Sequence, residues 1–321
     1  MDTNVTRCCA LPNFAKTLSE RSSCMSTDAL WQQFAYHLKV KRRSKNTLAN
    51  YDVTRRTLSR FLQEQGIEAE VATLTVSHLR AFLLWLEEQG LGPGGIHAHA
   101  RAVKAVFNWA EKEELIQRNP AKRLELPSLP KERQPTVTTV TAQALQKACK
   151  KSEQPLRDLA IVLTLFDTGV RVHELIGLRL EDLQFERGLI RVMGKGAKER
   201  FVPVGSKAMT AITGYIRRER RQKHAGVRHV FLSRCGQPLT REGVGIRLAK
   251  LAKSVGIARE ACAPHAFRRG FAVEFLRNGG DVFTLQQIMG HSSLDMTRRY
   301  VTFLDDDLKA AHLRFSPVDR L

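Results

Sequence analysis

The sequence predicts a mainly helical protein with one small β-hairpin, an α+β class, divided into two domains. Three observations support this prediction. Apolar residues recur at helical spacing from Asp28 to about Glu114, a proline-rich stretch then breaks the pattern, and LIRVMGKGAKERFVPV alternates like two strands around a glycine-containing turn. The predicted parts are a loose N-terminal extension at 1–26, a helical domain at 27–117, a basic linker at 118–136 and a second domain at 137–321.

The first domain is predicted to be a small helical bundle. Its helices are DALWQQFAYHL, SKNTLANYDVTRRTLSRFLQEQG, TVSHLRAFLLWLEEQG and a segment from Ile96 to about Glu113. Ser44 or Asn46 is the expected N-cap of the second helix, and Thr75 or Ser77 that of the third. The apolar stripes that should form the core include Leu30, Phe34, Leu38, Leu58, Phe61, Leu62, Val103, Val106 and Phe107.

A linker follows at Asn119 to Pro135, NPAKRLELPSLPKERQP. Proline restricts its own φ angle and the conformation of the residue before it, so this stretch is expected to be extended. Beyond it the pattern is mixed. The helices predicted in the second domain are VTAQALQKACKKS, LRDLAIVLTLFDTG, RVHELIGLRLEDL, TREGVGIRLAKLAKSVG, PHAFRRGFAVEFLRNGG and DVFTLQQIMG, with the hairpin after the third.

The charge balance indicates the partner. The chain carries 52 Lys+Arg against 32 Asp+Glu, a net charge of +20. A surplus this large favours a polyanion, of which nucleic acid is the commonest, although a ribosome-associated or merely basic protein would share it. No apolar run reaches the roughly 18 residues needed to span a bilayer, so no membrane partner is expected.

The cysteines favour a cytoplasmic location. They form no C-x-x-C pair, which argues against a zinc site and a disulfide framework, and the N-terminus lacks the apolar core of a secretory signal. A reducing cytoplasm is the simplest interpretation. The residues are Cys8, Cys9, Cys24, Cys149, Cys235 and Cys262.

Chemistry-bearing residues gather in four short segments of the second domain. TGVRVHEL places an arginine and a glutamate on one helix face, GKGAKER places a lysine at the hairpin tip, PHAFRRG places a histidine and an arginine on one face, and GHSSLDMTRRY adds a histidine and a tyrosine. The residues are Arg171, Glu174, Lys195, His265, Arg268, His291 and Tyr300.

This set fits metal-free phosphoryl transfer to a tyrosine. Two arginine forks can hold a phosphodiester and neutralise the charge of its transition state. Neighbouring guanidinium groups favour a phenolate, a histidine can take the phenol proton, and a lysine can protonate the departing oxygen. The sequence has no carboxylate cluster suited to magnesium and no Walker glycine loop. Neither a metal nor another cofactor is therefore expected.

These four segments, in this order, resemble the motifs of the tyrosine recombinase family, the phage-type integrases, and in particular its two-domain, Xer-like members. The resemblance covers roughly Asp28 to Asp307. It implies a SAM-like core-binding domain and a catalytic domain that together form a C-shaped clamp on DNA. It also implies a site-specific recombinase that cuts and rejoins strands through a Holliday junction, without ATP.

By the same resemblance, Tyr300 is the nucleophile that forms a 3′-phosphotyrosyl bond, and Arg171 and Arg268 bind the scissile phosphate. Lys195 protonates the 5′-hydroxyl leaving group, and His265 is the base for the tyrosine.

Two further roles follow from the resemblance, and two alternatives stay open. His291 would hydrogen-bond the phosphate, and Glu174 would be an accessory residue that orients the site. Glu174 could instead be a simple salt-bridge partner. Lys198 is a rival for the role of Lys195, because hairpin register is uncertain from sequence.

DNA contacts are expected from both domains. Basic residues at the start of a helix in the first domain and around the hairpin and one helix of the second should meet mostly phosphates. They could equally serve solubility. The predicted residues are Lys41, Arg42, Arg43, Lys45, Lys198, Arg200, Thr240, Arg241, Arg247 and Lys250.

The expected partner is double-stranded DNA with inverted-repeat core sites. The protein should be a monomer or weak dimer when free and a homotetramer in the synaptic complex, with the segment DDDLKAAHLRF docked on a neighbouring protomer or packed on its own domain. Two other functions compete. One is a type IB topoisomerase-like enzyme, and the other is a DNA-binding protein with an inactive site.

Overall fold

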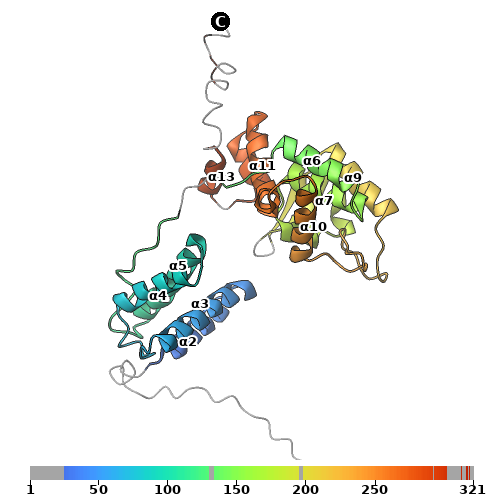
Figure 1. Ribbon diagram of the computed structural model, residues 1–321. Helices are drawn as coiled ribbons and strands as arrows, with labels where there is room; N and C mark the ends of the chain where they lie inside the picture. Colours follow the sequence, from blue (N-terminus) through green and yellow to red (C-terminus); the bar gives the residue numbers. More distant parts are fainter. Residues whose placement is uncertain are drawn as a thin grey trace, which may run out of the picture. The chain divides into compact units, whose positions relative to one another are not determined.

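The chain divides into two compact units, Met1–Glu132 and Arg133–Leu321, in this computed structural model (Figure 1). The residues that the structure describes are 25–129, 134–194, 198–291, 293–301, 312, 316 and 318. Nearly all of the predicted N-terminal extension and of the segment DDDLKAAHLRF therefore lies outside the described residues. Within those residues, no helix has the length and apolarity to cross a bilayer.

The described part of the first unit is a bundle of helices. They are α2 (Thr27–Val40), α3 (Lys45–Glu64), α4 (Val76–Glu88) and α5 (Pro93–Lys112). The side chains of Ser44 and Thr75 cap α3 and α4, each accepting a backbone hydrogen bond from three residues onward, which selects one of the two predicted caps in each case. Helix α5 begins at Pro93, three residues before the predicted start, because proline suits the first turn of a helix.

The core of this unit forms from the predicted apolar stripes. Leu30, Phe61 and Phe107 are at most 1% exposed. The same core takes in residues that follow the bundle: Ala121 and Leu124 are buried in it. Their backbone carbonyls accept hydrogen bonds from Lys104 Nζ at 3.4 and 2.6 Å. The first part of the predicted linker therefore packs on the bundle.

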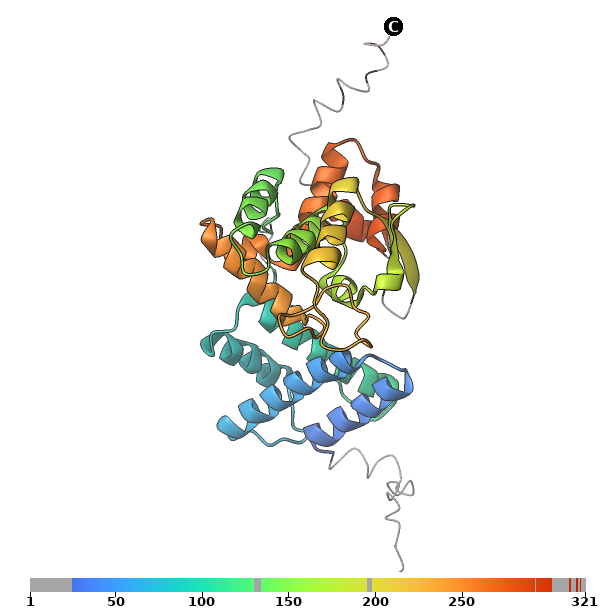
Figure 2. The ribbon, with the colours of Figure 1, turned by 90° about the vertical axis from the view of Figure 1, so that its right-hand side faces the viewer.

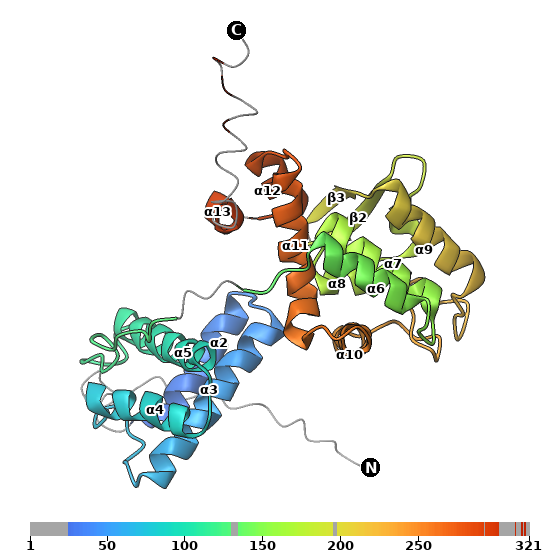
Figure 3. The same ribbon diagram turned by 45° about the horizontal axis from the view of Figure 1, so that its top comes forward.

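The second unit consists of helices and a three-stranded antiparallel sheet of order β1-β2-β3 at one edge (Figures 2 and 3). The predicted hairpin is β2 (Leu189–Met193) with β3 (Glu199–Pro203). The sequence did not predict β1 (Leu183–Gln184), nor helix α9. The helices are α6 (Thr139–Cys149), α7 (Pro155–Thr168), α8 (Val172–Gly177), α9 (Ser206–Arg218), α10 (Arg241–Ser254), α11 (Pro264–Arg277), α12 (Val282–Met289) and α13 (Leu294–Val301), with 3-10 turns at Leu180–Asp182 and Arg259–Cys262.

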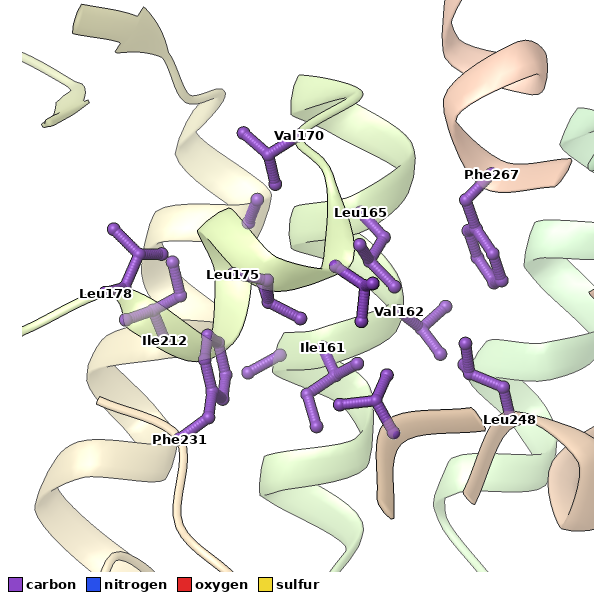
Figure 4. Packing of buried hydrophobic residues seen from close by; sticks show 14 of the residues in the cluster. Ile161, Val162, Leu165, Val170, Leu175, Leu178, Ile212, Phe231, Leu248 and Phe267 are labelled. Carbon is purple, nitrogen blue, oxygen red and sulfur yellow. The ribbon is translucent and has the colours of Figure 1, made fainter. Parts of the chain in front are cut away.

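Helix α7 is the centre of this unit. Its apolar residues Ile161, Val162 and Leu165 lie among side chains from several other elements, including Ile212 of α9 and Phe267 of α11 (Figure 4). This packing fixes the C-terminal end of α7, where Gly169 stops the helix in the left-handed conformation with φ 60°. A Cβ at this position would collide with the Phe271 ring, so the turn that leads into α8 requires glycine.

Candidate active site

Arg171 and Glu174 form one linked group at the start of α8. The backbone N–H of Arg171 donates to Glu174 Oε2 at 2.8 Å, and its guanidinium donates to Oε1 at 3.1 Å. The Glu174 side chain is fully buried, whereas that of Arg171 is 25% exposed. The carboxylate thus holds one side of the Arg171 guanidinium and leaves the rest of it partly exposed. This arrangement agrees with the predicted orienting role of Glu174. The same carboxylate also forms a salt bridge with Arg171, which was the predicted alternative.

Arg200 on β3 binds the same carboxylate. Its two terminal nitrogens donate to Glu174 Oε1 and Oε2 at 2.8 and 3.0 Å, and its Nε donates to the Ile288 carbonyl at 3.0 Å. Burial alone would raise the pKa of Glu174, but these bonds and the Arg171 backbone N–H hold it below its ordinary value. Arg200 was expected to contact DNA; its guanidinium is instead engaged inside the unit.

Arg268 on α11 is nearly inaccessible, at 5% exposed. One terminal nitrogen donates to the Gly169 carbonyl at 2.6 Å and the other to the Met289 carbonyl at 2.7 Å. Desolvation, and then the charge of Arg171, lowers the pKa of Arg268 to about 10. The guanidinium therefore stays charged at neutral pH, and it joins the end of α7 to the end of α12.

His291 and Tyr300 lie side by side after α12. The two rings stack with centroids 6.1 Å apart and an interplanar angle of 19°. His291 Nδ1 is 2.8 Å from Thr297 Oγ1. Desolvation, and then Arg268, Arg171 and Arg200, lowers the pKa of His291 to about 4, so the ring is neutral at pH 7.

Tyr300 also lies next to a small apolar cluster of its own unit. It is half-buried and packs against the cluster formed by Phe271, Ala272, Leu285 and Met289. Burial lowers the pKa of Arg268 and of Arg269, and a phenolate at Tyr300 would raise both.

His265 lies at the exposed start of α11. Partial desolvation, and then the charges of Arg269, Arg241, Arg268 and Arg171, lowers the pKa of His265. Desolvation and these positive charges thus favour the neutral form of the ring, which is the form that can accept a proton.

Lys195 lies outside the described residues, which stop at Gly194 and resume at Lys198. The Gly194 N–H donates to the Lys198 carbonyl at 2.8 Å, which closes the base of the hairpin loop. Lys198 is exposed. The choice between Lys195 and Lys198 stays a prediction.

Family profiles match both units. The Phage integrase family matches residues 136–306, and the Phage integrase SAM-like domain matches residues 29–126. The chain belongs to the phage integrase family, the tyrosine recombinases. It is 31% identical over 293 residues to the tyrosine recombinase XerD of Halalkalibacterium halodurans, an alignment that covers 89% of this chain and 97% of the relative. This confirms the predicted family and identifies the chain as a site-specific tyrosine recombinase.

Solved structures show the same fold. The Tn1549 transposon integrase in complex with transposon right end DNA superposes with a TM-score of 0.76 at 22% identity, covering 90% of this chain and all of that one (100%). A lambda integrase dimer bound to a COC′ core site gives 0.72 at 18% identity, covering 88% and 79%. These likenesses confirm the mainly helical fold class with a small sheet.

The predicted DNA contacts of the recombinase fall into two groups. The exposed residues are Lys41, Arg42 and Arg43 between α2 and α3, Lys45 at the start of α3, and Lys198, Thr240 and Arg241 in the second unit. Thr240 also caps α10 by accepting the Gly243 N–H at 3.0 Å.

Two predicted DNA contacts are instead engaged in ion pairs. Arg247 donates to the buried Asp158 at 2.6 Å, and Lys250 lies 3.3 Å from Glu153. Lys250 remains largely exposed, but Arg247 does not. Like Arg200, it has an internal partner that lies far away in the sequence.

The sequence analysis did not predict Thr297 as a site residue, and it did not predict the partner of Arg200. Thr297 is fully buried and meets His291, and Arg200 holds Glu174. A helical spacing of three from Leu294 to Thr297 was the only available signal for the first. Among the described residues, no group of three or more His, Cys, Asp or Glu side chains is arranged to hold a metal ion.

Proposed function

We propose that this recombinase acts on double-stranded DNA with inverted-repeat core sites, with Tyr300 as its nucleophile. The observation that carries this proposal is the stacking of the Tyr300 ring on His291, which is neutral at pH 7, within one chain. The phenol oxygen attacks the scissile phosphorus, a 3′-phosphotyrosyl bond forms, and the bond to the 5′-oxygen breaks. One ester replaces another, so rejoining needs no ATP.

The arginines have distinct tasks in this proposal. Arg171, partly exposed, presents its free donors to one non-bridging oxygen of the phosphate. Arg268, held by two backbone carbonyls, supplies a fixed positive charge behind it. Preorganised donors of this kind stabilise the charge that develops in the transition state and cost no reorganisation.

The histidines complete the site. In the His291 tautomer that carries its proton on Nε2, Nδ1 accepts from Thr297 Oγ1 and Nε2 can donate to the phosphate. His265, whose neutral form is favoured, takes the proton of the tyrosine. Lys195 protonates the 5′-oxygen as it leaves, as the family resemblance implies.

Assembly is also part of the proposal. Both units bind the duplex, with Lys41, Arg42, Arg43 and Lys45 on phosphates. The protein is a monomer or weak dimer when free, and four copies exchange strands through a Holliday junction. We place it in the cytoplasm, since Cys149, Cys235 and Cys262 are free thiols.

The test uses a nicked duplex that traps the covalent intermediate. A site is first selected with the wild-type protein from a randomised inverted-repeat library and from the DNA that flanks the gene. Wild-type protein should form a denaturation-resistant adduct on the selected site and exchange strands between two such sites. Tyr300→Phe, which keeps the ring and its packing, should bind the DNA and form no adduct. An adduct without paired-site exchange would support a topoisomerase, and binding without any adduct would refute strand transfer.

A further inference from the structure

Glu174 is shared by two arginines that approach it differently. Arg200 occupies both carboxylate oxygens with its two terminal nitrogens, at 2.8 and 3.0 Å. Arg171 contributes one guanidinium contact at 3.1 Å and a backbone N–H at 2.8 Å. The side-chain exposures are 0% for Glu174, 16% for Arg200 and 25% for Arg171. The geometry thus gives the stronger, bidentate pairing to the more buried arginine.

This sharing has a consequence for charge. Arg171, Glu174 and Arg200 together carry a net charge of +1, because two guanidinium groups face one carboxylate. Without Arg200, the pair that remains would be neutral. A buried carboxylate that loses its main partner also draws in the nearest remaining donor, since an unpaired buried charge is costly. The donors of Arg171 would then turn inward, away from the open part of the site.

The same guanidinium also supports the His291 turn. Its Nε donates to the Ile288 carbonyl at 3.0 Å, in the last turn of α12. A Cβ built on Gly290 would lie 3.0 Å from that Nε, so the arginine packs directly against the turn that leads to His291. Arg200 therefore touches the segments that carry Arg171 and His291.

We propose that Arg200 is a positioning residue of the recombinase, which takes up the charge of Glu174 so that Arg171 stays available to the scissile phosphate, and which holds the turn before His291. The proposal rests on the function proposed above. It assigns Arg200 an indirect part in strand cleavage, since the guanidinium faces Glu174 and the α12 carbonyl.

The first measurement is single-turnover cleavage of the nicked duplex selected with wild-type protein, at saturating protein. Arg200→Ala should cut about 10²-fold more slowly, comparable to the loss of one preorganised donor. Arg200→Lys should cut at a rate between those of wild-type protein and Arg200→Ala, because one ammonium group cannot make the bidentate contact and the Ile288 contact together.

The decisive measurement is a double variant. Glu174→Gln alone should slow cleavage, because the amide orients Arg171 poorly. In the Arg200→Ala background, however, Glu174→Gln should raise the rate about tenfold, because it removes the carboxylate that has become uncompensated. A residue that only stabilised the fold would not give this reversal of sign. Additive losses in the double variant would overturn the proposal.

Arg191 on β2 is the matched control. It pairs with Asp182 at 2.7 Å and with Glu199 of β3 at 3.5 Å, rather than with Glu174. Arg191→Ala should cleave at the wild-type rate per folded molecule, with the folded fraction measured by urea unfolding. Equal rate losses in the Arg191 and Arg200 variants would refute the assignment. Absence of any adduct with wild-type protein would instead refute the underlying function.

Discussion

Two buried carboxylates in the second unit each bind two arginines. The differences between them distinguish a group that stabilises the fold from one that serves the active site. Glu174 binds Arg171 and Arg200. Asp158 binds Arg157 at 3.0 Å and Arg247 at 2.6 Å, and both carboxylate side chains are fully buried. The two groups thus have the same composition and burial at their centres.

Their outer parts differ. The Arg157 side chain is 4% exposed, and all of its nitrogens are engaged. Its Nη1 donates to the Leu232 carbonyl, and its Nε and Nη2 donate to Asp158. Arg247 also faces a second carboxylate, Glu153, at 3.6 Å. In this group Arg157 and Arg247 thus face two carboxylates, Asp158 and Glu153, although Glu153 also meets Lys250 and the buried Nε of Arg247 has no partner. The Glu174 group keeps a positive charge and an arginine with free donors, which is what a phosphate site needs.

Arg157→Ala should show the structural nature of the Asp158 group. Removing a buried ion-pair partner costs up to about 3–5 kcal/mol; here Asp158 would keep only Arg247, and the Leu232 carbonyl would lose its donor. We expect the free energy of unfolding, measured by urea titration, to fall by that amount. The cleavage rate per folded molecule should stay at the wild-type value; a rate loss beyond the loss of folded protein would contradict the contrast.

Arg171→Ala should show the opposite pattern. Cleavage of the nicked duplex should slow by about 10²–10³, as expected when a donor to the transition state is lost. The free energy of unfolding should fall by only about 1 kcal/mol, because Arg200 still pairs with Glu174 and the lost side chain is partly exposed. A loss of stability as large as that of Arg157→Ala would show that the two groups are equivalent.

The elements that could be predicted from the sequence are those that a local pattern defines. The helices of the first unit were predictable, because the stripe of Leu30, Phe34 and Leu38 is a local signal. Strand β1 was not, since a two-residue strand is defined only by its pairing with β2. Helix α9 starts at a glycine N-cap without a side-chain hydrogen bond, so it lacks the usual start signal.

In the active site, motif spacing predicted the residue types but not their internal partners. Arg200 lies 26 residues from Glu174 and 88 from Ile288 along the chain, and Arg247 lies 89 from Asp158. From sequence, each of these arginines is simply a basic residue in a basic protein. Whether its charge faces DNA or a buried carboxylate is determined by tertiary packing, which no local pattern reports.

The environment of His291 should also appear in the pH dependence of stability. Desolvation, and then the charges of Arg268, Arg171 and Arg200, lowers the pKa of His291 to about 4 in the folded chain, against an ordinary value of 6.5. Between these values the unfolded chain binds a proton that the folded chain does not, so stability falls as pH decreases from 6.5 to 4, by about 1–2 kcal/mol for a ring that is partly screened by solvent. Urea titrations across this range should show a smaller decrease for His291→Asn. Identical slopes would refute the low pKa.

The substitution Gly290→Ala should have the smallest effect, and it tests the position of Arg200 without changing any charge. Gly290 and Gly66 both have left-handed backbones, with φ 63° and 62°. A Cβ at Gly290 would press on the Arg200 guanidinium at 3.0–3.1 Å, whereas one at Gly66 would meet nothing within 4 Å.

Both alanine variants should therefore lose about 1–2 kcal/mol of unfolding free energy from backbone strain alone. Only Gly290→Ala should also slow cleavage, by about tenfold, because its methyl group displaces the fork that holds Glu174 and the turn before His291. Single-turnover rates corrected for the folded fraction measure this difference. If the two variants cleave equally fast, the placement of Arg200 is not critical, and its contribution reduces to charge alone.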